Sequence, residues 1–135
     1  MHIIGIAAPV RHALQALGML AAQPFGSLRV EQMASRLGLP AAALSKCLQR
    51  LARKGLLKAR RGPGGGYRLA VDARSVTLAA VASALDEGGG RRGRCLLSDK
   101  ACQGEGPCLL HHGAIEAEAG LRRALERLTL ADLTA

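Results

Sequence analysis

Apolar residues recur every three or four positions in five stretches of the chain, and this spacing predicts five amphipathic helices. The expected helices cover residues 9–22, 30–37, about 41–54, about 78–86 and about 107–128. Pro9 and Pro107 suit first-turn positions, and Thr77 can cap the fourth helix. In the third helix Cys47 falls inside the apolar stripe, which indicates a small buried hydrophobic residue and not a ligand.

A different pattern separates the third and fourth helices. Residues 56–60 and 67–70 alternate apolar and basic side chains around a Gly- and Pro-rich stretch, which predicts a β-hairpin. The second and third helices are joined by Gly38-Leu39-Pro40, as in a helix-turn-helix. The expected fold is therefore mainly α with a small β-hairpin, a winged helix-turn-helix domain followed by a long C-terminal dimerisation helix.

The last predicted helix is too long for a compact winged domain to cover, and its apolar stripe has no obvious partner within the chain. Pairing with a second copy would bury that stripe, and a two-fold dimer suits a palindromic operator. We therefore expect three divisions: a DNA-binding domain over residues 1–87, a cysteine-rich loop over 88–108 and a dimerisation helix with its tail over 107–135. The stripe includes Ala117, and the expected homodimer interface comprises Ala114, Leu121, Leu125 and Leu128.

Charge is distributed unevenly. The chain carries 19 Lys and Arg against 10 Asp and Glu, a net charge of +9. No acidic residue lies between Glu31 and Asp72, whereas nine basic residues fall there, and this one-signed stretch predicts a surface that faces DNA phosphates. A hairpin wing would bring Arg60, Arg61 and Arg68 to the backbone or minor groove. The predicted DNA-contacting residues are Arg29, Ser45, Lys46, Gln49, Arg50, Arg60, Arg61 and Tyr67.

Three of the four cysteines cluster near a histidine. Cys95, Cys102, Cys108 and His111 offer three soft thiolates and one imidazole on a stretch that contains Gly104, Gly106 and Pro107. That donor set suits an iron–sulfur cluster, while zinc and a thiol redox switch remain open from the pattern alone. The closely paired ligands of structural zinc sites are missing, and three clustered cysteines do not form an even disulfide framework.

Other classes of protein are disfavoured by the sequence. The apolar runs are shorter than the roughly 20 residues that a membrane helix needs, and the N-terminus lacks the basic region of a signal peptide. No paired catalytic carboxylates, nucleophile–base pattern or nucleotide-binding loop is evident, so neither an enzyme nor a small-molecule substrate is expected. We expect a cytoplasmic, nucleoid-associated protein.

Taken together, the chain resembles the Rrf2 family of bacterial winged-helix regulators, which includes the IscR and NsrR types. The resemblance rests on RHALQALGMLA, VEQMASRLGLPAAALSKCLQRLARKGLLK, RGPGGGYRLA and CQGEGPCLLH. It implies a homodimer that senses redox state, nitric oxide or iron–sulfur status through a bound cluster. It also implies that Cys95, Cys102, Cys108 and His111 are the ligands.

The resemblance also bears on the type of cluster. The acidic ligand of the NsrR type is replaced by Arg11, which favours [2Fe–2S] over [4Fe–4S]. The alternatives are a cluster-free thiol- or zinc-based regulator and, less favoured, a thiol or electron-transfer protein.

Overall fold

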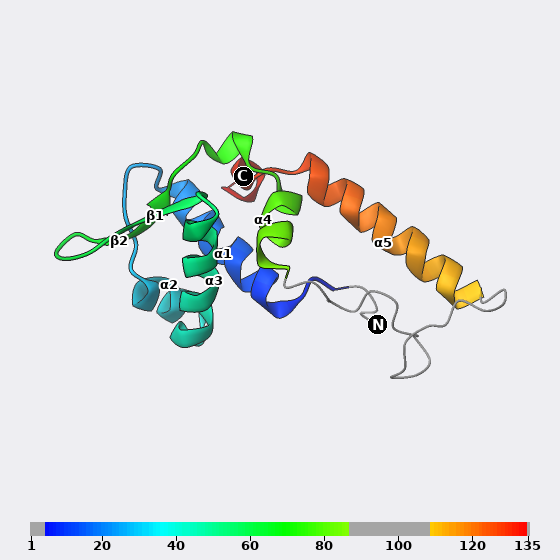
Figure 1. Cartoon of the computed structure of the whole chain (residues 1–135), viewed down its shortest axis with the longest axis horizontal. Helices are drawn as coiled ribbons and strands as arrows, with labels where there is room; N and C mark the ends of the chain where they lie inside the picture. The colour runs from blue at the N-terminus through cyan, green and yellow to red at the C-terminus, as the bar shows by residue number, and fades with distance from the viewer. Residues whose placement is uncertain (1–4, 87–108, 135) are drawn as a thin grey trace.

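The computed structural model describes residues 5–86 and 109–134. Figure 1 shows the described elements as a helical body with a hairpin projecting on one side and a long helix on the other. In chain order they are α1 (Ala8–Ala22), α2 (Val30–Leu37), α3 (Ala41–Arg53), β1 (Leu57–Arg60), β2 (Gly66–Leu69), η1 (Ala73–Ser75), α4 (Leu78–Leu85), α5 (Leu109–Arg127) and η2 (Leu130–Thr134). The hairpin and the five α-helices confirm the predicted fold class.

The hydrophobic core is centred on α1, which contacts α2, α3, α4, β2 and η2. Aliphatic side chains at the helical spacing turn inward from α1 and α3, because burying that stripe removes apolar surface from water. Leu17, Leu48 and Leu51 are fully buried, and Cys47 lies among them as predicted. This core fixes the position of α3 and leaves its other face exposed.

The turn between α2 and α3 depends on Gly38. Its backbone has φ of 65°, in the left-handed region that glycine adopts most readily. The amide of Leu39 donates to the carbonyl of Ala34 at 2.9 Å, which satisfies a carbonyl at the end of α2. Pro40 then precedes the first residue of α3. The helix-turn-helix predicted from the sequence is confirmed.

The hairpin is antiparallel, with Leu57 opposite Leu69, Lys58 opposite Arg68, Ala59 opposite Tyr67 and Arg60 opposite Gly66. A third segment joins its edge, because Leu28 and Tyr67 exchange two backbone hydrogen bonds of 3.0 and 2.8 Å. Leu28 and Leu57 are both buried. We call β1, β2 and the loop between them the wing, and its buried side packs on the helical body.

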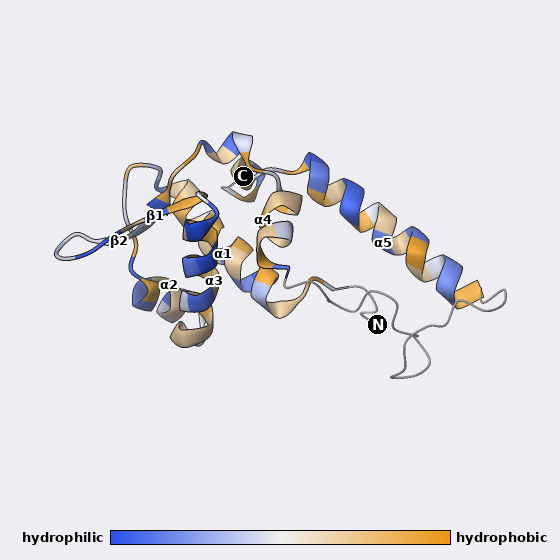
Figure 2. Cartoon of the chain, viewed as in Figure 1, coloured by the Kyte–Doolittle hydropathy of each residue, from blue (hydrophilic) through white to orange (hydrophobic). Residues whose placement is uncertain are grey.

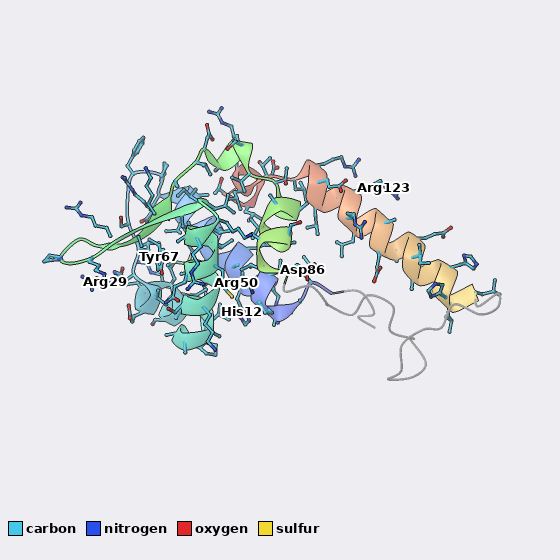
Figure 3. All side chains as sticks on the ribbon, in the orientation of Figure 1. His12, Arg29, Arg50, Tyr67, Asp86 and Arg123 are labelled. Carbon is cyan, nitrogen blue, oxygen red and sulfur yellow. The ribbon has the colours of Figure 1, made fainter. Side chains whose placement is uncertain are left out.

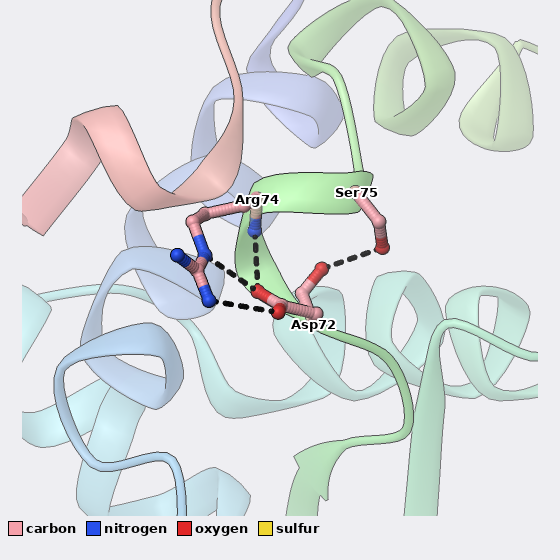
Figure 4. A network of polar contacts seen from close by, with 3 residues as sticks. All are labelled: Asp72, Arg74 and Ser75. Atoms are coloured by element: carbon pink, nitrogen blue, oxygen red, sulfur yellow. Dashed lines mark hydrogen bonds and ion pairs between the residues drawn. The ribbon is translucent and has the colours of Figure 1, made fainter.

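A small polar network turns the chain from the wing toward α4 (Figure 4). The Asp72 carboxylate accepts from the backbone amide of Arg74 at 2.9 Å and lies 3.4 Å from its guanidinium. These contacts, the backbone hydrogen bond first, lower the pKa of Asp72. The Ser75 hydroxyl donates to the Asp72 carbonyl at 2.7 Å, so that η1 is closed by local hydrogen bonds. Thr77 then caps α4 by accepting from the amide of Ala80, as predicted.

The last elements return to the body. Leu78 donates to the Leu128 carbonyl at 2.9 Å and Leu130 donates to the Val76 carbonyl at 3.0 Å, so the residues after α5 pair with those before α4. Leu130 is fully buried, although the sequence pattern did not predict η2. The N-terminal part of α5 points away from the body (Figure 1) and carries both hydrophobic and hydrophilic residues (Figure 2).

Element boundaries agree with the predicted ranges to within one or two residues where both ends are described. The predicted start of the last helix at Pro107 lies outside the described residues. Within the described residues, α5 begins at Leu109. The three divisions at 1–87, 88–108 and 107–135 remain predictions, because the whole cysteine-rich stretch lies outside the described ranges.

Candidate nucleic-acid interface

The exposed side of α3 carries four of the predicted DNA-contacting residues. Lys46 and Gln49 are exposed, and Ser45 and Arg50 are half-buried at the margins of the same face. The Gln49 amide donates to the Ser45 hydroxyl at 3.2 Å, so these two candidates for base contact already form a pair. Helix α3 thus presents hydrogen-bonding and cationic side chains on the surface opposite its buried stripe, as a recognition helix requires.

The wing carries most of the remaining predicted contacts. Arg60 and Arg61 are exposed, at the end of β1 and the start of its loop, while Tyr67 on β2 is half-buried. Arg29 is also exposed, but its guanidinium donates to the Gly62 carbonyl at 3.0 Å. This bond connects the residue before α2 to the wing loop, so Arg29 positions the wing in addition to any contact it makes with DNA.

Side chains from these elements gather on one half of the molecule. Figure 3 shows Arg29 and Tyr67 beside the hairpin, Arg29 nearer its loop and Tyr67 nearer the body, and Arg50 on α3, with Arg123 far away on α5. Every one of the nine cations between Glu31 and Asp72 is exposed except the half-buried Arg50. A stretch that is acid-free in sequence therefore becomes a surface in which α3 and the wing are both positive. Lys58 on β1 belongs to this surface and Phe25 lies beside it, although neither was among the individually predicted contacts.

The proposed metal ligands fall in different parts of the chain. Cys95, Cys102 and Cys108 lie outside the described residues. His111 is half-buried in the first turn of α5, and its ring lies 6.4 Å from that of exposed His112. Within residues 5–86 and 109–134, no group of three His, Cys, Asp or Glu could hold a metal. The ligand assignment is therefore a prediction from the donor set.

Cys47 is separate from that cluster of cysteines. It is buried on α3, where its thiol donates to the Pro9 carbonyl at 3.6 Å. Desolvation raises the pKa of the Cys47 thiol, and the nearby charge of Arg50 opposes this with a smaller effect. A protonated, buried thiol is a poor nucleophile and metal ligand, which agrees with the structural role predicted for Cys47.

The arrangement can be compared with known proteins. The model of the Rrf2 family, described as iron-dependent transcriptional regulators, matches residues 6–135. The chain belongs to the Rrf2 family. Among curated members, the regulator IscR of Yersinia pseudotuberculosis is 33% identical over 108 residues, which cover 80% of this chain and 65% of that protein. The chain thus spans slightly less than two thirds of the length of this relative.

Solved structures support the Rrf2 fold. IscR of T. potens aligns with a TM-score of 0.74 and 21% identity, covering 97% of this chain and 86% of that one. CymR, the global cysteine regulator of B. subtilis, aligns with a TM-score of 0.75 and 23% identity, covering 98% and 97%. At these identities the likeness establishes the winged-helix fold.

The matching family model and the curated relative IscR both describe transcriptional regulators, which is consistent with the expectation that the chain is not an enzyme. Among the described residues, no helix is both long and apolar enough to cross a membrane.

Proposed function

We propose that this protein is a homodimeric transcriptional regulator that binds a palindromic DNA operator and responds to a bound iron–sulfur cluster. The observation that carries the DNA-binding part is the acid-free stretch between Glu31 and Asp72, most of whose cations lie on α3 and the wing. In this proposal α3 enters the major groove, where Ser45, Lys46 and Gln49 reach base edges. The wing arginines contact phosphates beside or within the adjacent minor groove.

The cluster part of the proposal rests on the chemistry of the donor set. Cys95, Cys102 and Cys108 supply thiolates, and His111 supplies an imidazole from the start of α5. Iron–sulfur clusters favour these ligands, and the residues fit [2Fe–2S] better than [4Fe–4S] because Arg11 cannot act as an acidic fourth ligand. When bound, the cluster supplies a centre that responds to redox change or nitric oxide. The physiological signal would be redox state, nitric oxide or iron–sulfur status.

Chain order indicates how ligation would reach the DNA-binding surface. The three cysteines lie between α4, which packs on the body, and α5, which we propose as the dimer helix. His111 belongs to α5 itself. Ligands within this connection and on α5 itself would together fix the direction in which α5 leaves the body. The spacing of the two recognition helices in the dimer would then depend on ligation.

Metal analysis tests the cluster directly. Anaerobically purified protein is expected to contain about two iron and two sulfide per chain with visible charge-transfer absorption, as ligation of one [2Fe–2S] cluster requires. About four of each would indicate [4Fe–4S] and a fourth ligand other than His111. Zinc, or no metal after anaerobic reconstitution, would contradict the cluster and favour a zinc- or thiol-based regulator.

Substitution of His111 tests the fourth ligand. His111→Ala is expected to shift the visible absorption bands and to accelerate cluster loss in air, because one of four ligand positions is then open to water. His112→Ala is the matched control, since His112 is the adjacent residue, is exposed and is not an assigned ligand. Equal spectra and equal rates of cluster loss in both variants would contradict the assignment of His111.

Substitution at the wing tests the phosphate contacts. The Arg60→Ala/Arg61→Ala double variant is expected to lower the slope of log K against log salt by about 1.8 per wing, because each phosphate contact contributes about 0.9. The measurement is a fluorescence titration with a duplex selected by the protein from a random pool, at four salt concentrations. Arg122→Ala/Arg123→Ala removes the same charge from exposed positions on α5 and should preserve the slope. An unchanged slope in the wing variant would exclude these arginines from the phosphate contacts.

A further inference from the structure

A hollow of about 500 Å³ lies against the solvent-facing side of the wing. Three cations line it, together with an aromatic side chain from the loop between α1 and α2. Among the described residues, no acidic side chain contributes to its lining. We call this surface the outer wing face; it consists of Phe25, Ser27, Lys58, Ala59, Arg60, Gly64 and Arg68.

The register of the hairpin forces the positive charges together. Lys58 and Arg68 are directly opposite each other, and Arg60 follows Lys58 on the same face because side chains alternate along a strand. Like charges in directly opposite positions destabilise an antiparallel pair. An anion bound in the hollow would attract both of these side chains and so offset their mutual repulsion.

Phe25 is the second unusual feature of the outer wing face. It is one of only two aromatic residues in the chain and its side chain is 99% exposed. An aromatic ring fully in water gains nothing from the fold, whereas a ring beside cations can rest on the apolar part of an anionic ligand. The sugar–phosphate backbone of a nucleic acid offers both an anionic phosphate and an apolar deoxyribose surface.

The opposite side of the wing has a hollow of its own. This second space, of about 250 Å³, lies beside the start of α2. Tyr67 faces away from Arg68 because consecutive strand residues point to opposite sides. The lining of this hollow comprises Arg29, Val30, Glu31, Arg60, Arg61, Gly62, Gly65, Gly66 and Tyr67. Arginine side chains are therefore available on both sides of the hairpin, and Arg60 reaches both hollows.

We propose that the wing is a two-sided clasp that holds the two phosphate backbones bordering one minor groove, the outer wing face binding the strand farther from α2. The minor groove is about 6 Å wide and is bounded by two backbones, so a hairpin entering it meets one on each side. Lys58 and Arg68 bind phosphates of the farther strand, and Phe25 rests on its deoxyribose. Arg29 and Arg61 bind phosphates of the nearer strand. This inference rests on the DNA binding proposed above and adds the residues for the second strand.

Phosphate ethylation interference can assign each strand. The probe is the duplex selected by the protein from a random pool, labelled on either strand. Wild-type protein is expected to show interference on both strands across the minor groove at the wing. Lys58→Ala/Arg68→Ala should lose interference on one strand only and lower the salt slope by about 1.8 per wing. Arg122→Ala/Arg123→Ala should retain both strands, because it removes equal charge from α5.

A variant at Phe25 separates the apolar contact from the charge. Phe25→Ala should weaken binding severalfold at every salt concentration and leave the slope unchanged, because no ionic contact is lost. If Lys58→Ala/Arg68→Ala changes neither the salt slope nor the interference on either strand, the clasp is overturned. The outer wing face would then be a binding site for an acidic protein segment. Failure of the wild-type protein to select any duplex would instead contradict the proposed DNA-binding function itself.

Discussion

Replacing Gly66 with alanine is expected to detach the wing from the body and to weaken DNA binding more than the same change at Gly62 or Gly64, where an added Cβ would meet nothing within 4 Å. An added Cβ at Gly66 would lie 2.4 Å from the Leu28 carbonyl oxygen and 2.9 Å from the Arg29 amide nitrogen. Both contacts are to backbone atoms, which cannot rotate away as a side chain can. The Leu28–Tyr67 hydrogen bonds must therefore lengthen or break.

The backbone conformation adds to this cost. Gly66 has φ of 129°, a region that residues with a side chain rarely adopt. Strain of this kind costs about 1–3 kcal/mol, and each of the two hydrogen bonds contributes about 0.5–1.5 kcal/mol. Gly66→Ala should thus lower the free energy of unfolding by about 3 kcal/mol, measured by urea denaturation monitored with circular dichroism.

Gly62→Ala is the matched control for the Gly66 prediction. Gly62 also has a positive φ, 90°, but an added Cβ there would meet nothing within 4 Å. Its cost is expected to be only the conformational one, about 1–2 kcal/mol. If both variants lose the same stability and the same DNA affinity, the close approach of Leu28 to Gly66 contributes nothing to holding the wing.

The helices could be predicted because each has one continuous apolar face. In α1 and α3 the residues spaced by three and four are those that the core buries, and Cys47 follows the same rule. The spacing of apolar residues indicates which side of a helix or strand is buried on folding. It therefore identifies the type of element and its buried face together. The turn at Gly38 could be predicted equally well, because the residues that signal it are adjacent in the sequence.

Contacts between segments distant in the sequence were not predictable in this way. The Thr77–Thr129 and Leu28–Tyr67 bridges involve a single pair of residues each, too short to produce an alternating pattern. The burial of Leu130 depends on η2 returning to α1, a tertiary contact with no periodic signature. Leu125, predicted to belong to the dimer interface, is also packed against the core of its own chain.

For the candidate site, composition predicted the sign of the surface and the structure supplied its geometry. The absence of acid between Glu31 and Asp72 is visible in the sequence, but the pairing of Lys58 with Arg68 requires the strand register. The exposure of Phe25 depends on the path of the loop between α1 and α2. The bond from Arg29 to Gly62 joins residues 33 positions apart, so its positioning role could not be predicted from local sequence.

Leu121→Glu is expected to convert the protein from a dimer to a monomer and thereby to abolish tight binding to a palindromic duplex. Helix α5 contains no fully buried residue, although Ala114 and Leu121 are partly covered and Leu110 and Ile115 are about half exposed. A stripe of this kind is stable in water when a second copy covers it. A carboxylate at its centre would have to be buried without a partner in the dimer, which costs several kcal/mol.

Position 121 separates dimerisation from folding better than position 125 does. Leu125 contacts the chain's own core, so a change there would lower monomer stability as well, whereas Leu121 is not part of that core cluster. Sedimentation equilibrium should show that the Leu121→Glu variant is a monomer. Circular dichroism should show that this monomer keeps its helix content. Its affinity for the full palindrome should fall by about 10²–10⁴, because the two half-sites are no longer bound by one linked molecule.

The control for Leu121→Glu places the same carboxylate on another face of α5. Arg123 is exposed and lies two residues further along the helix, roughly opposite Leu121. Arg123→Glu should therefore remain dimeric and keep its affinity for the palindrome apart from a small, salt-dependent loss. If Leu121→Glu also remains a dimer, the apolar stripe of α5 is not the interface between subunits. If it becomes a monomer but binds the palindrome as tightly as before, the two wings and recognition helices do not act as a pair.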